Sequence, residues 1–279
     1  MEQKRAGSSK KKAGILYAVL GLSVGAVAFL AAVLTLEIYT AEQGQTYYSS
    51  LSAGAEQGTT DTYKPRQDAP SLHDYSVEPA DAPEEHTSVM DFDSLAEISP
   101  NIVAWIKSEG TAVNYPIVKG EDNHFYLSHL PDGNYHEMGS IFLDYRNSAD
   151  FSDENILIYG HDMRSGQMFG SLRHYRNQNY YEQYCDMFIF TPKQDYKLTL
   201  FAGYILDSAY ETPPMDFNDS ADFEGYIDDI KRRSIFKSDI PVSFGDRLVF
   251  LATCTQSGSI NERLIIVGKL EDAGGECRI

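Results

Sequence analysis

An uncharged, apolar segment of 24 residues, from Ala13 to Leu36, limits the possible folds of this chain more than any other feature. As a helix rising about 1.5 Å per residue, it is long enough to cross a hydrocarbon layer of about 30 Å. A cleavable signal sequence usually has an apolar run of only about 7–15 residues. We therefore expect an uncleaved transmembrane anchor at residues 13–36, followed by a separate folded part.

Charge is distributed unevenly about this segment. Residues 1–12 carry five basic side chains and one acidic side chain, whereas the whole chain has a formal net charge of −18. Because positive flanks stay in the cytoplasm, we expect residues 1–12 to be cytoplasmic and the rest of the chain to be extracellular. The acidic body would repel polyphosphates, which argues against a nucleic-acid partner.

The chain after the anchor falls into three parts. Residues 37–88 are rich in Ser, Thr, Gly, Gln, Asp, Glu and Pro and lack sustained apolar periodicity, which predicts a flexible stalk. Residues 89–272 contain the patterned segments of a folded domain, and residues 273–279 form a short tail. We expect a cytoplasmic end, an anchor, a stalk and one domain, in that order.

The pattern of residues 89–272 is mainly that of β-strands with a few helices between them. The expected strands are Ile102–Lys107, Asn114–Lys119, Ser140–Tyr145, Asn155–Tyr159, Met187–Thr191, Tyr196–Ile205, Arg247–Thr253 and Arg263–Leu270. The expected helices are Phe92–Ile98, Asn123–Leu130, Ser171–Tyr184 and Ala221–Ser234. Eight strands in one domain favour a closed barrel, which leaves no exposed sheet edge.

Three cysteines are too few and too scattered for a disulfide framework or a zinc site. Cys185 precedes an apolar strand and is expected near the core, and Cys277 lies in the tail. Cys254 ends the apolar run RLVFLATC and precedes a polar loop, so a strand would deliver its thiol to the barrel rim. On position alone, a buried and inert cysteine remains the alternative interpretation.

Two further strand ends carry residues that suit thiol chemistry. His161 follows the apolar run NILIYG, and Arg263 opens the run RLIIVGKL nine residues after Cys254. A permanent cation near a cysteine and a histidine can stabilise the oxyanion formed when a thiolate attacks a carbonyl group. The other six histidines lie in stalk, helix or loop contexts, where a solvated or packed role is the default: His73, His86, His124, His129, His136 and His174.

With these residues in place, the sequence resembles a sortase, specifically one of class B. The segments that carry the resemblance are NYPIVKGEDNHFYL, GSIFLDYRN, NILIYGHDMRSGQMFGSL and LATCTQSGSINERLIIVGKL. The resemblance implies a mainly β fold with peripheral helices: an eight-stranded barrel that has a long helix between its sixth and seventh strands. It also implies a cysteine transpeptidase. The sequence contains no metal-ligand cluster and no phosphate-binding glycine loop, so we expect no cofactor.

The resemblance assigns a role to each site residue. Cys254 would attack the backbone carbonyl of a sorting motif, His161 would act as the general acid and base, and Arg263 would stabilise the oxyanion or the bound peptide. The matching substrate-binding positions are Asn123, Leu127, Tyr159, Ala252 and Thr253.

Ala252 stands where the family often has serine and is expected on the same strand face as Cys254, which affects the expected substrate preference. The implied partners are secreted proteins with a C-terminal sorting motif and an acceptor amine from a peptidoglycan precursor or a pilin. A hydrolytic cysteine peptidase would use the same Cys254 and His161. A non-catalytic, stalked surface-interaction module with a structural Cys254 is the other alternative.

Overall fold

The computed structural model describes residues 2–57, 88–254 and 262–273, with side chains at residues 23–56, 88–253 and 262–273. The helical elements are α1 (Glu2–Gln57), α2 (Phe92–Ile98), η1 (Phe125–Leu127), η2 (Phe169–Arg176), α3 (Gln178–Gln183) and α4 (Ser220–Arg233). The strands are β1 (Ile102–Lys107), β2 (Asn114–Lys119), β3 (Ile141–Leu143), β4 (Asn155–His161), β5 (Asp186–Phe190), β6 (Asp195–Asp207), β7 (Arg247–Cys254) and β8 (Glu262–Asp272).

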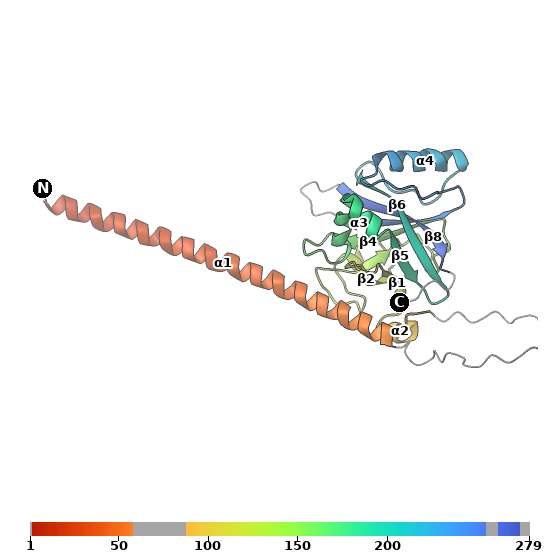
Figure 1. The fold of residues 1–279 in the computed structure, drawn as a ribbon. Helices are drawn as coiled ribbons and strands as arrows, with labels where there is room; N and C mark the ends of the chain where they lie inside the picture. Colours follow the sequence, from red (N-terminus) through yellow and green to blue (C-terminus); the bar gives the residue numbers. More distant parts are fainter. Residues whose placement is uncertain (1, 58–87, 255–261, 274–279) are drawn as a thin grey trace, which may run out of the picture. The chain divides into compact units, whose positions relative to one another are not determined.

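The eight strands form a closed barrel in the order β1-β2-β3-β4-β7-β8-β6-β5, with β5 pairing back to β1 (Figure 1). Two of the pairings, β2 with β3 and β4 with β7, are parallel, and the others are antiparallel. The expected eight-stranded barrel is therefore confirmed. Parallel neighbours bring matching strand ends to one rim, and this places the ends of β4 and β7 together.

Side chains on β4, β7 and β8 alternate between two cores. Ile156, Val249 and Ile266 belong to the core inside the barrel, whereas Leu157 and Phe250 pack outside the sheet with α4. The sequence patterning predicts α4 correctly: Asp219 caps its first turn by accepting a hydrogen bond from the backbone N–H of Asp222 at 2.9 Å. The helix covers one side of the barrel (Figure 1).

The expectation of an irregular stalk from residue 37 is wrong for residues 37–57, which continue α1. Residues from Tyr47 onward belong to the same compact unit as the barrel, and Met1–Thr46 form a separate unit. Tyr48, Leu51 and Ala55 are each at most 5 % exposed. Their i, i+3, i+7 spacing makes one apolar helix face, which packs on the barrel domain and is easily missed within a polar sequence.

Three other expected segments differ from the structure in extent. Only Phe125–Leu127 of the expected helix 123–130 is helical, and the helix expected at 171–184 is divided into η2 and α3 at Asn177, whose side chain caps α3. The strand expected at 140–145 is reduced to β3, although the Asp144 backbone N–H still donates to the Leu157 carbonyl of β4 at 2.9 Å.

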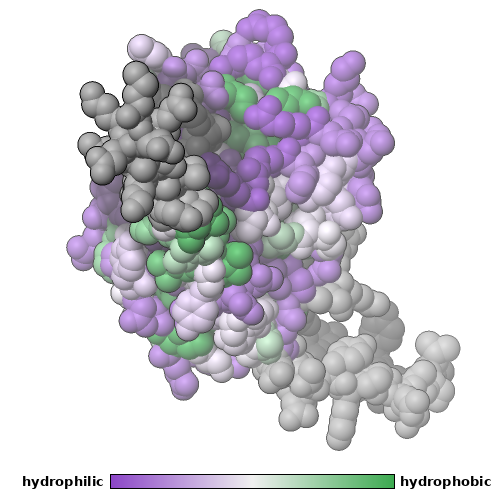
Figure 2. Space-filling view, turned by 90° about the vertical axis from the view of Figure 1, so that its left-hand side faces the viewer, coloured by the Kyte–Doolittle hydropathy of each residue, from purple (hydrophilic) through white to green (hydrophobic). Residues whose placement is uncertain are grey.

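The N-terminal helix has a membrane-compatible segment. Within the part of α1 whose side chains are described, a window with a mean hydropathy of 1.9 lies near the N-terminus and is not buried in the protein. Its length and composition fit a single membrane span. Elsewhere the surface is largely hydrophilic in the view of Figure 2, in keeping with the net charge of −18.

Candidate active site

The ends of two parallel strands bring Cys254 and His161 together. In the register of β4 and β7, Tyr159 is the Cα partner of Ala252, and His161 is the Cα partner of Cys254. Six of the eight residues of β7, from Leu248 to Thr253, are buried, so the strand is held firmly between its neighbours. The register therefore places the two strand ends side by side at the level of the backbone.

Arg263 lies on the opposite neighbour of β7. The antiparallel β7–β8 ladder ends at the pair Ala252 and Ile265, so Arg263 lies two residues beyond the ladder, near the end of β7 that carries Cys254. The Arg263 side chain is partly buried, and its Nη1 donates a hydrogen bond to the carbonyl oxygen of Glu262 at 3.2 Å. Cys254 thus ends the strand that lies between β4, which carries His161, and β8, which carries Arg263.

The imidazole of His161 is held by the backbone of η1. Its Nε2 lies 2.5 Å from the carbonyl oxygen of Leu127. Because a carbonyl oxygen only accepts hydrogen bonds, Nε2 carries the proton in this contact. Nδ1 therefore remains as the ring nitrogen that is able to take up and release a proton.

The Leu127 carbonyl is itself confined by a tight turn at Gly139. Ser140 donates its backbone N–H to the Tyr126 carbonyl at 2.9 Å, and Gly139 has a φ of +56°. A Cβ atom at Gly139 would lie 2.6 Å from the Leu127 oxygen and 2.5 Å from the Tyr126 oxygen. Only glycine allows this close approach, so the turn fixes the position of the acceptor that holds His161.

Asn123 and Tyr159, two of the predicted substrate-binding residues, come together through Asp144. Asn123 Nδ2 and Tyr159 Oη donate to the same Asp144 oxygen, at 3.0 Å and 2.9 Å. Sequence reasoning missed Asp144, although an acid directly after the apolar segment IFL was a usable signal. The Leu127 side chain is partly buried and packs against the same core cluster as Tyr159.

The two predicted residues before the nucleophile differ in their surroundings. Ala252 is 2 % exposed and packs in the outer core cluster, next to Tyr159 in the β4–β7 register. Thr253 is fully buried, and its Oγ1 accepts a hydrogen bond from the Leu264 backbone N–H at 3.0 Å. The Thr253 side chain thus links the end of β7 to β8.

The fold and these residues match one protein family. A family model described as the sortase domain matches residues 106–271, which is more than half of the chain. The chain belongs to the sortase family.

Its similarity is to class B sortases in particular. Sortase B of Staphylococcus aureus (strain NCTC 8325 / PS 47) is 33% identical over 180 residues, which are 64% of this chain and 74% of that protein. A Staphylococcus aureus sortase B–substrate complex has a TM-score of 0.69 at 28% identity and covers 83% of this chain and 97% of that one. A sortase B complexed with triglycine has a TM-score of 0.62 at 32% identity and covers 65% and 85%. This chain is therefore a class B sortase, a cysteine transpeptidase.

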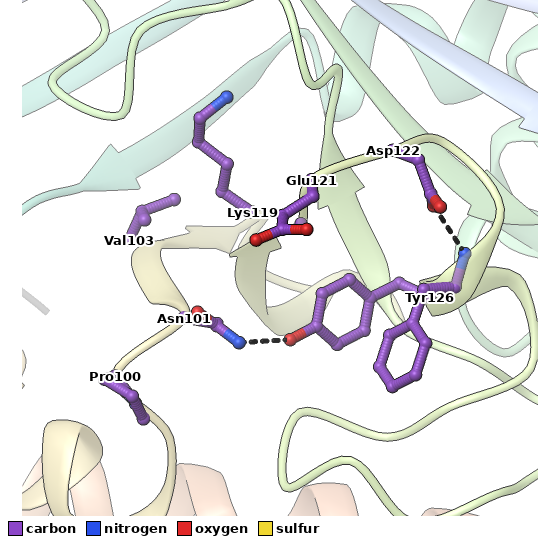
Figure 3. A pocket seen from close by; sticks show the side chains of 9 residues that line it. Pro100, Asn101, Val103, Lys119, Glu121, Asp122 and Tyr126 are labelled. Atoms are coloured by element: carbon purple, nitrogen blue, oxygen red, sulfur yellow. Dashed lines mark hydrogen bonds between the residues drawn. The ribbon is translucent and has the colours of Figure 1, made fainter.

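A cavity of about 530 Å³ in this sortase is lined in part by the loop just before η1. Figure 3 shows Asn101 bonded to the Tyr126 hydroxyl at its edge, with Glu121 near them. Its lining includes none of the residues that the sequence predicts for catalysis or substrate binding. Among the residues that the structure describes, no cluster of three or more His, Cys, Asp or Glu side chains is arranged to hold a metal ion.

Proposed function

We propose that Cys254 is the nucleophile of this sortase and forms a thioester with its substrate. The observation that carries the proposal is the register that makes Cys254 and His161 Cα partners at one barrel rim. The thiolate adds to a backbone carbonyl carbon, the amide C–N bond breaks, and an acyl-enzyme results. The acceptor amine then attacks the thioester, a new amide bond forms, and the thiolate leaves.

His161 moves the protons in both half-reactions. In the first, Nδ1 delivers a proton to the leaving amine, and in the second it takes a proton from the incoming amine. The Leu127 carbonyl supports this role because it holds Nε2–H and keeps Nδ1 as the exchanging nitrogen. One residue thus serves as acid and then as base.

Arg263 stabilises the negative charge that develops on the substrate carbonyl oxygen. Its guanidinium group is charged at every physiological pH and presents several donors in a fixed fork. Its place at the start of β8, two residues from the last β7–β8 pair, Ala252 and Ile265, supports this assignment. A preorganised cation of this kind lowers the barrier for each tetrahedral intermediate.

The donor substrate is a peptide sorting motif on a secreted protein, and the acceptor is an amine. The first assignment is supported by the similarity to a sortase B–substrate complex and the second by that to a sortase B complexed with triglycine. We assign Asn123, Leu127, Tyr159 and Ala252 to the peptide groove and leave Thr253 outside it, because its hydroxyl oxygen accepts a hydrogen bond from the Leu264 backbone N–H. The natural amine belongs to a peptidoglycan precursor or a pilin.

The enzyme acts at the outer surface of a membrane in this proposal. The apolar part of α1 anchors the chain in a single pass. Five basic residues before the anchor favour a cytoplasmic N-terminus and an extracellular barrel. This placement gives the enzyme access to secreted proteins and to cell-wall amines.

Ligation of a peptide to an amine tests the proposal. The full chain in detergent is incubated with a peptide library, and peptides that trap a thioester on Cys254 are identified by mass spectrometry. The best peptide is then incubated with increasing triglycine. We expect a ligated product that grows with triglycine concentration, whereas hydrolysis alone at every concentration would replace the transpeptidase with a hydrolytic peptidase.

A further inference from the structure

Asp144 is a buried carboxylate that is hydrogen-bonded to two residues assigned to the peptide groove. It is 0 % exposed and follows β3 directly. One oxygen accepts hydrogen bonds from the Arg146 backbone N–H at 3.0 Å and from Arg146 Nε at 2.8 Å. The other accepts from Asn123 Nδ2, Tyr159 Oη and Arg146 Nη2 at 3.0, 2.9 and 2.8 Å. All of its acceptor capacity is used within the protein.

These bonds fix the orientation of both groove residues. Asn123 donates through Nδ2 to Asp144 and accepts through Oδ1 from the Tyr145 backbone N–H at 3.0 Å, so its amide has only one satisfactory orientation. Tyr159 is held at its hydroxyl by Asp144 and at its ring by stacking on Phe142, with centroids 5.2 Å apart. Two side chains from distant parts of the sequence are thus aligned on one acceptor.

Arg146 keeps the carboxylate charged in this buried position. Burial raises the pKa of Asp144, but hydrogen bonds from Arg146, Tyr159 and Asn123 outweigh this effect and lower the pKa to about 2. The Arg146 side chain is itself 42% exposed, so its other side remains in contact with solvent. An ionised acceptor binds neutral donors more strongly than an amide oxygen does.

We propose that Asp144 is a positioning residue that sets the substrate affinity of this sortase by orienting Asn123 and Tyr159. It does not contact the substrate, because its oxygens are occupied and its side chain has no exposed surface. This proposal rests on the assignment of Asn123 and Tyr159 to the peptide groove. An orienting carboxylate improves binding of the peptide without taking part in the bond-making steps.

Replacement of Asp144 by asparagine tests this role while nearly conserving shape. The new amide keeps only one acceptor oxygen and puts an NH2 group in place of the other, so either Arg146 or the pair Asn123 and Tyr159 would face a donor and the common anchor would be loosened. With the best library peptide and the full chain in detergent, we expect KM to rise about tenfold and kcat to change less than about threefold. Labelling of Cys254 by a small methanethiosulfonate reagent should stay at the wild-type rate.

A matched control is available in another strand. Asp186 also pairs with a cation and a hydroxyl group, through Lys197 at 3.0 Å and Thr199 at 3.1 Å, but it lies in β5. Asp186→Asn should leave KM unchanged. A rise in KM equal to that of Asp144→Asn would show a general effect of losing an ion pair and would overturn the proposal.

A variant that lacks both groove residues' bonds to Asp144 shows whether Asp144 acts by orienting them or only by stabilising the fold. In the double variant Asn123→Ala/Tyr159→Phe, Asp144 has no groove residue left to orient, so adding Asp144→Asn should leave KM within about twofold. A further rise of about tenfold in that background would contradict the proposal. The unfolding temperature of each variant is measured alongside, because a structural role would lower it without this dependence on background.

If Asp144→Asn is unfolded at the assay temperature, a second variant tests whether Asp144 sets the substrate affinity. Arg146→Gln leaves Asp144 in contact with Asn123 and Tyr159 but loosens the carboxylate. KM should then rise about threefold, and an unchanged KM would overturn the proposal. Failure of the wild-type enzyme to process any library peptide would count against the proposed function itself, and wild-type turnover with unchanged KM values in the variants would count against Asp144 alone.

Discussion

His161 and Cys254 are Cα partners at matching ends of the parallel strands β4 and β7. The spacing of the two residues is therefore set by the hydrogen-bond register of the barrel, because both lie in paired strands and not in loops. Arg263 lies at the start of β8, the neighbour of β7 on the other side. Three separate segments of sequence contribute one residue each, and the strand order brings them to a single rim.

The first prediction concerns the nucleophile. Cys254→Ala should abolish thioester formation and peptide ligation without changing the circular dichroism spectrum. A methanethiosulfonate reagent should label wild-type Cys254 quickly, whereas Cys185 should react slowly because it is half-buried and burial raises the pKa of its thiol. Cys185→Ala serves as the control and should keep full activity. Rapid ligation by Cys254→Ala would remove Cys254 from the mechanism.

The second prediction concerns the cation at the start of β8. Arg263→Ala should lower kcat/KM about 10²- to 10³-fold, because the oxyanion loses its stabilising charge. Arg263→Lys should recover only part of this loss, since lysine keeps the charge but lacks the planar fork of donors. Steady-state kinetics and unfolding temperatures of both variants check this. Wild-type turnover in Arg263→Ala would exclude the residue from catalysis.

The third prediction concerns the turn that confines the Leu127 carbonyl. A methyl group at Gly139 would lie 2.6 Å from that oxygen, so Gly139→Ala should displace the acceptor that orients His161. We expect kcat, measured at saturating peptide, to fall at least about tenfold.

Gly133→Ala is the matched control for this variant. Gly133 also has a positive φ, +84°, but a Cβ there meets no atom within 4 Å. This control should lose about 1 kcal/mol of stability from backbone strain and keep its kcat. Equal losses of kcat in both variants would show that backbone strain alone is responsible.

The fourth prediction concerns stability in acid. The pKa of Asp144 is about 2 in the folded protein, below the usual aspartate value of 3.8. A depressed pKa means that the carboxylate stabilises the fold above about pH 4 and that this contribution, about 2 kcal/mol, is lost as the pH falls towards 2. Urea unfolding of wild type and Asp144→Asn between pH 2 and 7 should therefore converge at the acid end. A constant difference across the range would contradict the assigned pKa.

The sequence predicts the barrel better than its connections, for physical reasons. Strands such as β4 and β7 are buried apolar runs that composition locates; the expected strands end at Tyr159 and Thr253, within two residues of the observed ends at His161 and Cys254. The role of Asp144 depends on partners such as Asn123, 21 residues away, which no local pattern indicates. The same is true of Gly139, whose importance arises from carbonyl groups on a neighbouring loop.

The fifth prediction concerns the end of α1, where the sequence suggested a stalk. Leu51 is 5 % exposed and packs with Met90, Leu95 and Trp105 in one core cluster. Leu51→Ala should therefore lower the free energy of unfolding of the barrel domain by about 2–5 kcal/mol. Gly54 lies in the same helix with no atom within 4 Å of an added Cβ. Gly54→Ala should raise stability by about 0.5–1 kcal/mol, because alanine favours the helix. An unstructured stalk would make both changes neutral, so urea unfolding of the two variants, with opposite signs expected, distinguishes a docked helix from a flexible linker.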